Sequence, residues 1–282
     1  MTTFNVKKIL NNNVLIAEND DYKEVVLIGK GIGFNRKKDD ILSEQFVEKI
    51  FILKDRVKQE QYKSLLPQMD DETLDAIVDA LEYIKKQTHT GLDEHIHVAL
   101  TDHLMFSIYR TLKGLTIKNP FLYETKTIYP TEYEIASEVV NIVNKSINIQ
   151  LPEDEVGFIT LHIHSAISHK DLSKVNQDNQ LINKLIHIIE GAFQTVIDKQ
   201  SIDYIRLVRH LRFTIERAND GEELEEPSTI IFALQNEYPF CYNLSWKLIK
   251  IMQNSLKKPI GNVEAVYLTV HLQRMYEKLK TK

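Results

Sequence analysis

Two pairs of histidines recur at matching places along the chain. His103 and His162 form the first pair, and His210 and His271 form the second, with nearly the same spacing inside each pair. A neutral imidazole is a nucleophile near physiological pH because its unperturbed pKa is about 6.5. It can therefore accept a phosphoryl group without a separate base. A histidine packed in a helical core is the alternative interpretation, and the presence of a pair in both places favours the chemical one.

An arginine follows the first histidine of each pair by seven residues, Arg110 after His103 and Arg217 after His210. On a helix this spacing returns to the same face two turns later, about 10.5 Å along the axis. The guanidinium could lean toward a phosphate bound to the histidine. An arginine in a surface ion pair explains the spacing equally well.

Metal binding is the other chemistry that clustered histidines suggest. The closest pairs are His95 with His97 and His162 with His164. On a helix, residues two apart point to faces about 200° apart and cannot share one ion. The sequence also has no HExxH motif. We therefore expect no metal site and no cofactor, with His95, His97 and His164 on the surface or between helices.

The histidines belong to a longer internal repeat. Three stretches occur twice: HLMFSIYR at 103–110 and HLRFTIER at 210–217, YPTEY at 129–133 and YPFCY at 238–242, and EVGFITLHI at 155–163 and EAVYLTVHL at 264–272. The offset between the two copies is nearly the same for all three stretches, as a true duplication requires. Apolar residues in this part recur at helical spacing, as in ETLDAIVDALEYI. The sequence predicts two homologous all-α helical-bundle domains, at residues 65–170 and 171–282.

Residues 1–57 have a different pattern. FNVKKIL, NNVLIAE, KEVVLIG and VEKIFIL are short, rich in Val and Ile, and separated by turn formers. This predicts four strands of a small antiparallel sheet. Such a small sheet buries little surface per residue, so we expect a homodimer. The fold class is multidomain: a β-domain at residues 1–57, a polar linker at 58–64 that runs into a helix, and the two helical domains.

Composition limits the class of protein. The chain is 43% hydrophobic and 27% charged, and no apolar run approaches the roughly 18 residues of a membrane span. We therefore expect no membrane insertion. The N-terminus lacks the pattern of a secretory signal, and a single cysteine, Cys241, excludes an internal disulfide, so we expect a cytoplasmic protein. Residues 1–56 carry ten Lys or Arg against nine Asp or Glu, although the whole chain has a net charge of −5. An anionic partner should meet this first segment.

The stretch GKGIGF at 29–34 could contact a ligand. Its glycines fit neither the dinucleotide-binding nor the phosphate-loop pattern, and no GxSxG motif is present, so we expect no enzyme. A Gly-Lys-Gly turn lets the backbone approach a ligand closely, with Lys30 as a charge and Phe34 as a stacking ring. The asparagines at 11–13 are suited to hydrogen-bonding base edges. These features are typical of a nucleic-acid surface, and a solvated hairpin tip is the alternative.

Taken together, KKILNNNVLIA, VVLIGKGIGF, LTDHL, HLRFTIER and TLHI or TVHL resemble the bacterial transcriptional antiterminators of the bgl/sac family. These proteins have an N-terminal co-antiterminator RNA-binding domain and two phosphotransferase-system (PTS) regulation domains, called PRDs. The resemblance covers essentially the whole chain and is closest to the glucose-operon members. It implies a dimeric β-domain that binds a leader-mRNA hairpin, rather than DNA, and prevents formation of an overlapping terminator.

The resemblance also implies the site residues. The positions that match the family's RNA-contacting turns are Lys8, Asn13, Gly29, Lys30, Gly31 and Phe34. Relatives often have Arg where this chain has Lys30, which keeps the charge but loses the bidentate fork. The two histidine pairs match the family's phosphoacceptors. The implied donors are a sugar-specific enzyme II, expected to be that of glucose, for the first helical domain and the phosphocarrier HPr for the second.

Two other functions stay open at this point. A phosphohistidine-sensing regulator that acts through protein contacts, without RNA binding, would use the β-domain only to dimerise. A phosphotransfer enzyme would pass the phosphate on to a small molecule. The two helical domains also differ, because Asp102 precedes His103 whereas Arg209 precedes His210. We hypothesise that they prefer different donors, which equal transfer rates from both donors to each separated domain would contradict.

Overall fold

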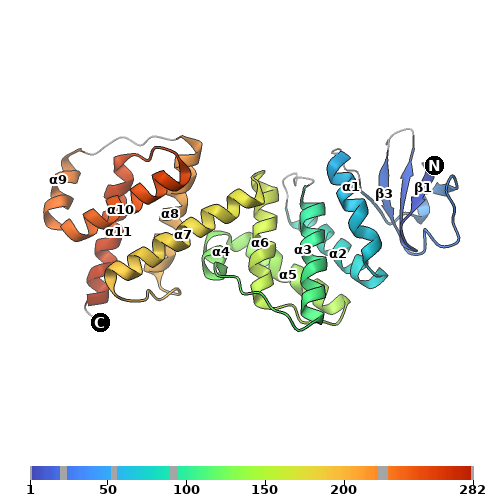
Figure 1. Cartoon of the computed structure of the whole chain (residues 1–282), viewed down its shortest axis with the longest axis horizontal. Coiled ribbons are helices and arrows are strands. Elements are labelled where there is room, and N and C mark those ends of the chain that lie inside the picture. The colour runs from blue at the N-terminus through green and yellow to red at the C-terminus, as the bar shows by residue number, and fades with distance from the viewer. Residues whose placement is uncertain (1, 20–23, 52–55, 89–94, 222–227, 281–282) are drawn as a thin grey trace. The chain divides into compact units, whose positions relative to one another are not determined.

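The N-terminal part of the chain folds as an antiparallel sheet of five strands (Figure 1). The computed structural model describes residues 2–19, 24–51, 56–88, 95–221 and 228–280. The strands are β1 (Thr3–Ile9), β2 (Val14–Glu18), β3 (Val25–Ile28), β4 (Ile41–Ser43) and β5 (Lys49–Phe51), with the short 3-10 helix η1 (Glu44–Phe46) between the last two. Their spatial order is β4-β1-β2-β3-β5, and all neighbours are antiparallel.

The predicted antiparallel β-domain is confirmed, with one strand more than expected. The four predicted runs correspond to β1, β2, β3 and β5, and residues 23, 52 and 53 of those runs lie outside the described residues. Strand β4 was missed because it has only three residues and its first, Ile41, is exposed, so no alternating pattern marks it. It pairs with β1, where Leu42 lies opposite Phe4.

Both faces of the sheet are buried. One face forms a core from alternate residues of the three central strands and from the segment that follows them: Phe4, Val6, Leu15, Ala17, Val25, Leu27, Ile32 and Leu42. The other face carries Val14, Ile16, Val26 and Ile28, which are also buried. Helix α1 (Arg56–Leu65) lies on this second side, because its Lys63 pairs with Glu24, two residues before Val26. Residues 58–64, predicted as a linker, lie within helix α1, which this ion pair links to the sheet and which also packs against α3.

The rest of the described chain is helical, as predicted. After η2 (Leu66–Gln68), the first set of helices is α2 (Asp71–Gln87), α3 (His95–Leu112), α4 (Leu122–Ile128), α5 (Pro130–Ser146) and α6 (Glu153–Ser168). The second set is α7 (Leu172–Phe193), α8 (Ile202–Asp220), α9 (Ser228–Glu237), α10 (Pro239–Leu256) and α11 (Asn262–Lys280). Helices α3 and α8 hold the two copies of the first repeated stretch, and α6 and α11 hold the two copies of the third, as the repeat requires.

Local sequence signals set the ends of several helices. The Asp70 side chain caps α2 by accepting a hydrogen bond from the Thr73 amide at 2.7 Å, and Ser201 caps α8 by accepting from the Tyr204 amide at 3.1 Å. Helix α8 ends at Gly221, whose φ of 73° suits a residue without a side chain. These residues set the start of α2 and both ends of the histidine-bearing helix α8.

Contacts divide the chain into two compact units that do not follow the repeat completely. Unit 1 comprises residues 1–118 and 132–170, and unit 2 comprises residues 119–131 and 171–282. Helix α4, which comes from the first repeat, therefore packs with α7 and α8 of the second. The predicted domain limits at 57, 64 and 170 stay predictions, because a contact unit need not fold independently.

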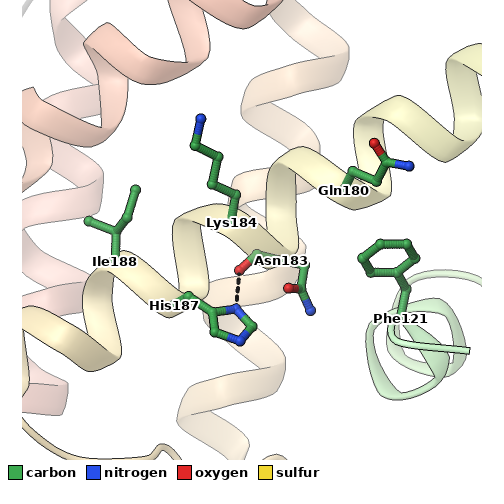
Figure 2. A pocket seen from close by; sticks show the side chains of 6 residues that line it. All are labelled: Phe121, Gln180, Asn183, Lys184, His187 and Ile188. Atoms are coloured by element: carbon green, nitrogen blue, oxygen red, sulfur yellow. Dashed lines mark hydrogen bonds between the residues drawn. The ribbon is translucent and has the colours of Figure 1, made fainter.

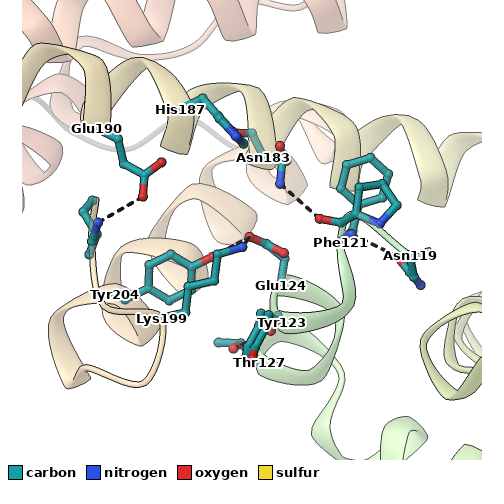
Figure 3. Close-up of polar contacts among 12 residues, drawn as sticks. Asn119, Phe121, Tyr123, Glu124, Thr127, Asn183, His187, Glu190, Lys199 and Tyr204 are labelled. Atoms are coloured by element: carbon teal, nitrogen blue, oxygen red, sulfur yellow. Dashed lines mark hydrogen bonds and ion pairs between the residues drawn. The ribbon is translucent and has the colours of Figure 1, made fainter. Parts of the chain in front are cut away.

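A buried carboxylate holds the 119–131 segment within unit 2 (Figure 3). Glu124 is 0% exposed, and its Oε1 accepts hydrogen bonds from Lys199 Nζ at 3.1 Å and from the Tyr204 hydroxyl at 2.5 Å. Burial and then the nearby Glu124 raise the pKa of Tyr204, so the phenol stays a donor. At the end of α4, Arg212 Nη1 donates to the Ile128 carbonyl at 2.6 Å. The segment is thus bound by charged contacts at both ends of α4.

We predict that Glu124→Ala lowers the unfolding free energy of unit 2 by about 3 kcal/mol, because Lys199 and Tyr204 would lose their shared acceptor. Urea unfolding followed by the fluorescence of Trp246, the single tryptophan of the chain, measures this change within unit 2. The exposed Glu237 of the same unit supplies the matched control, Glu237→Ala. Equal unfolding midpoints for the two variants would contradict the stabilising role of Glu124.

Candidate functional site

The first histidine pair comes together between two helices. His103 of α3 and His162 of α6 have ring centroids 4.9 Å apart, at an interplanar angle of 43°. Both side chains are half-buried. The predicted pairing of these distant positions is thus a direct contact in unit 1, and the Phe158 ring lies beside it, 5.9 Å from His103.

A buried carboxylate organises this pair. Glu155 of α6 is 2% exposed, and its Oε2 lies 3.0 Å from His103 Nε2. The same oxygen accepts a hydrogen bond from the Ser107 hydroxyl at 2.7 Å, and Oε1 accepts one from Arg110 Nη2 at 2.8 Å. His103, Ser107 and Arg110 lie on one face of α3 because they are four and three residues apart. One carboxylate of α6 therefore joins three side chains of α3.

The second pair repeats this arrangement. His210 of α8 and His271 of α11 have ring centroids 5.0 Å apart. Glu264 of α11 is also buried, and its Oε2 lies 3.5 Å from His210 Nε2. It accepts hydrogen bonds from the Thr214 hydroxyl at 2.7 Å and from Arg217 Nε at 2.7 Å. The two units thus each contain a histidine pair, a buried glutamate, a hydroxyl and an arginine.

The sequence did not point to the two glutamates, and for Arg110 and Arg217 it predicted only a shared helix face with the histidines. Glu155 and Glu264 are the first residues of the repeated stretches EVGFITLHI and EAVYLTVHL, so the repeat itself could have found them. Each lies two helical turns before the second histidine of its pair, on the same face. Arg110 is not on the surface: it is 7% exposed and bound to Glu155. The alternative of a surface ion pair is therefore wrong for Arg110.

The surroundings keep most of these imidazoles neutral. Burial first, and then the neighbouring His103 and His95, lower the pKa of His162 to about 3. Burial, His271 and Arg217 lower the pKa of His210 to about 4. The pKa of His271 is lowered as well, first by burial and then by Arg274 and Arg206. A neutral imidazole retains a lone pair, so these rings can act as nucleophiles at physiological pH.

Burial and hydrogen bonding have opposite effects on the glutamate of the first site. Burial raises the pKa of Glu155. Its hydrogen bonds with His103 and Ser107 and the charges of His103 and Arg110 lower it by more, so the pKa is lowered overall. Glu155 is therefore an ionised acceptor, and any second anion placed next to it would be repelled.

Of the other histidines, His95 is exposed but near enough to His162 to lower its pKa, and His97 is half-buried. His164 Nδ1 lies 2.9 Å from Glu132 Oε1 of α5, which ties α5 to α6. In the described ranges, no group of three or more His, Cys, Asp and Glu side chains is arranged to hold a metal ion. Among the described helices, none has a stretch long and apolar enough to cross a membrane.

The predicted RNA-contacting residues of the β-domain fall mostly on two adjoining turns. Asn13 Oδ1 accepts a hydrogen bond from the Gly31 amide at 2.7 Å, and the Asn13 carbonyl accepts one from the Gly29 amide at 3.0 Å. Lys30 is exposed between the two glycines, and Phe34 is 65% exposed after them. Asn13 therefore supports the turn that presents the lysine and the phenylalanine.

Glycine is required at positions 29 and 31 of this turn for two different reasons. A Cβ on Gly29 would lie 2.6 Å from the Phe46 carbonyl oxygen, so a side chain there would force the backbone apart. Gly31 has open space around it but a φ of 69°, which disfavours other residues. Lys8 lies elsewhere, exposed on β1. Its cross-strand partner is Ile16, so Lys8 lies on the second face of the sheet. Burial first, and then the charge of Lys8, lower the pKa of Lys63.

A surface hollow lies along α7 in unit 2 (Figure 2). Its lining consists of Phe121, Gln180, Asn183, Lys184, His187 and Ile188. His187 Nδ1 donates to the Asn183 carbonyl of its own helix at 2.8 Å. None of the predicted site residues lines this hollow, and its polar groups come mainly from one helix, so it adds nothing to the histidine sites.

Comparison with known proteins matches the two parts of the chain to two domain families. The PRD domain family matches residues 78–166 and again residues 183–275. The CAT RNA binding domain family matches residues 4–60. The histidine pairs therefore lie within the two PRD matches, and the Asn13–Gly31 turn lies within the RNA-binding match.

Full-length relatives point the same way. The "PtsGHI operon antiterminator" of Bacillus subtilis (strain 168) is 52% identical over 277 residues, which cover 98% of this chain and 99% of that protein. The "GlcA/glcB genes antiterminator" of Staphylococcus carnosus (strain TM300) is 41% identical over 274 residues, 96% of each chain. A solved structure described as "Crystal structure of GlcT CAT-PRDI" is 50% identical, with a TM-score of 0.54, and covers 59% of this chain and 99% of that one. The chain belongs to the family of transcriptional antiterminators that join a CAT RNA-binding domain to two PRD domains.

Proposed function

We propose that this chain binds a leader-mRNA hairpin as a homodimer and prevents formation of an overlapping terminator, so that transcription continues. The match of residues 4–60 to an RNA-binding family supports the RNA as partner. The relatives named for PtsGHI and GlcA/glcB support a PTS-linked, glucose-type operon as target. The chain would act in the cytoplasm, on nascent RNA, as a regulator and not as an enzyme.

We propose the two histidine pairs as phosphoacceptors for PTS-dependent control. The observation that carries this proposal is the duplicated arrangement, with ring centroids 4.9 and 5.0 Å apart and a buried glutamate at each site. A core histidine needs no repeated carboxylate, hydroxyl and arginine around it. The acceptors would be His103 and His162 in the first PRD, at residues 65–170, and His210 and His271 in the second, at residues 171–282. The donors would be HPr and a glucose-specific enzyme II.

The chemistry of the site explains how phosphorylation would be transmitted. A phosphohistidine carries close to two negative charges, which would lie within a few ångströms of the ionised Glu155. Repulsion from Glu155 and competition for Arg110 would weaken the contact between α3 and α6. The phosphorylated domain would therefore pack its helices differently, and this change would bias the dimer that binds RNA.

Three exposed side chains of the β-domain form the RNA-binding surface that we propose. Lys8, Lys30 and Phe34 are exposed and could contact phosphate or bases directly. Asn13 uses its side-chain oxygen inside the protein, so we propose that Asn13, with Gly29 and Gly31, shapes the turn. RNA loops and bulges expose unstacked bases, which suits an exposed phenylalanine at the end of such a turn.

Replacement of Phe34 should weaken RNA binding. For the full chain and a leader hairpin with an internal loop, taken from upstream of a glucose-transporter gene, we expect Phe34→Ala to reduce affinity about tenfold or more, because one aromatic–base stack is lost. Gel shift or fluorescence anisotropy measures the change. Ile41→Ala removes an exposed apolar side chain of the same domain, on the edge strand β4, and should have little effect.

Either of two results would change the assignment. Tight binding to another sugar operon's leader, but not to this one, would keep the family and exclude glucose. Failure of the wild-type chain to bind any leader hairpin would support a regulator that works through protein contacts alone.

Each paired histidine should lose its own phosphate on substitution. Phospho-HPr and phosphorylated enzyme II serve as donors. We expect the total phosphate on the chain to fall in each of the four single His→Ala variants, and the loss to be confined to the changed residue or its pair partner. Mass spectrometry at neutral pH, where phosphohistidine survives, locates the phosphate. His187→Ala is the control, because His187 is exposed on α7 and outside both pairs. Unchanged phosphorylation in all four variants would refute the proposed acceptors.

The neutrality of His162 should make the stability depend on pH. Its folded pKa of about 3 lies below the unfolded value of about 6.5. Below pH 6.5 the unfolded chain therefore binds a proton that the folded chain does not. The stability present above pH 6.5 should fall by up to about 1.4 kcal/mol per pH unit as the pH drops toward 3. His162→Gln should flatten this slope in urea titrations between pH 6.5 and 4.5. A His162 NMR resonance that titrates near 6.5 would contradict the prediction.

A further inference from the structure

The two histidine sites differ in the charged residues of the helices that form them. Helix α8 carries Arg206 and Arg209, and α11 carries Arg274. The positions of the first PRD that the repeat aligns with these three are occupied by Ala99, Asp102 and Ser165. Three arginines in the second site thus replace an alanine, an aspartate and a serine in the first. The histidines, the glutamate and the hydroxyl are common to both sites, so these arginines are a feature of the second site alone.

The contacts between α8 and α11 place two of these arginines near His271. On α8, Asp203, Arg206 and His210 are three and four residues apart and so share one face. That face meets α11 at both of its ends: Asp203 Oδ1 lies 2.5 Å from Arg274 Nη2, and the His210 and His271 rings are 5.0 Å apart. Arg206 therefore lies between these two contacts, opposite the stretch of α11 from His271 to Arg274.

Asp203 orients the second arginine. It pairs with Arg274 at 2.5 Å and with Lys278 at 2.7 Å, and both partners lower its pKa by hydrogen bonding and charge. Arg274 is three residues from His271 on the same face of α11, whereas Lys278 is seven residues away, about 10.5 Å along the axis. A guanidinium has five N–H donors, so Arg274 can keep Asp203 and bind a second anion.

Arg206 is the less constrained of the two. Within the part of the chain that the structure describes, its guanidinium makes no hydrogen bond or ion pair with another side chain. The charges of Arg274 and Arg206 nevertheless act on His271. Burial is the largest cause that lowers the pKa of His271, the two arginines lower it as well, and Asp203 raises it. Two cations thus act on one half-buried imidazole that carries no negative charge of its own.

We propose that Arg206 and Arg274 form a clamp that binds the phosphoryl group on His271, so that the second PRD holds phosphate more tightly than the first. This inference rests on the proposed function, because it takes His271 as a phosphoacceptor. In the transfer, the bond between phosphorus and the HPr imidazole breaks and a bond to a His271 nitrogen forms. The proton that leaves the His271 ring is matched by the one that the HPr ring regains. The clamp lowers the free energy of the product through charge-assisted hydrogen bonds to the phosphoryl oxygens.

The equilibrium between HPr and His271 tests the clamp directly. The full chain is incubated with fixed ratios of phospho-HPr to HPr, and phosphate on His271 is quantified by mass spectrometry. We expect Arg206→Ala and Arg274→Ala each to lower the equilibrium constant for phosphate on His271 roughly tenfold. Arg206→Lys should lie between these variants and the wild type, because it keeps charge without the bidentate fork.

Matched variants separate the clamp from general effects of charge and folding. Lys278→Ala removes a cation bound to the same Asp203 but distant from His271, and should leave the constant unchanged. Ala99→Arg places a cation at the equivalent position of the first PRD and should increase phosphate on His162. Unchanged constants for both arginine variants, or an equal fall for Lys278→Ala, would overturn the proposal.

A second measurement distinguishes failure of the clamp from failure of the proposed function. If wild-type His271 accepts no phosphate from phospho-HPr, the proposed function is wrong at this residue. The clamp is then tested by titrating the unmodified full chain with inorganic phosphate while the His271 NMR signals are followed. A saturable shift that Arg206→Ala weakens would support an anion site, and the absence of any shift in the wild type would exclude it.

Discussion

The buried carboxylate of Glu155, and its counterpart Glu264, is the interaction on which the rest of each histidine site depends. A carboxylate taken out of water costs several kcal/mol unless its oxygens are fully hydrogen-bonded or paired with cations. Glu155 meets this requirement with His103, Ser107 and Arg110 of the facing helix. Glu264 meets it with Thr214 and Arg217, while His210 Nε2 lies 3.5 Å away without a hydrogen bond. In the first site, His103 is therefore held by the same carboxylate that joins α3 to α6.

This arrangement makes the helix contact sensitive to charge. In the unmodified site, the glutamate is the anion and the arginine is its cation. A second anion on the imidazole would compete for that arginine and repel the carboxylate, since both lie in a partly buried setting where screening by water is weak. A small covalent change can thus alter how α3 packs on α6, or α8 on α11, without a flexible loop or a ligand pocket.

The two PRDs are similar in sequence yet not equal in structure. Helix α4 comes from the first repeat but packs in unit 2, where Glu124 meets Lys199 and Tyr204. The residue that corresponds to Tyr204 in the first repeat is His97, which has no phenol to donate. The duplicated helices therefore share their order and their histidine sites, while the contacts of α4 are particular to the second copy.

The sequence by itself determined the class of fold, the duplication and the residues of both histidine pairs, because helical periodicity and a constant offset depend only on the order of residues. It also marked four of the five strands, and it missed β4 because three residues with an exposed isoleucine carry no readable alternation. Only the tertiary structure decided that Arg110 binds Glu155, that Asn13 supports the Gly31 turn, and that α4 packs with the second repeat. Those outcomes depend on which helix faces and turns meet between distant parts of the chain, and on how buried charges find partners there. No local pattern encodes that choice.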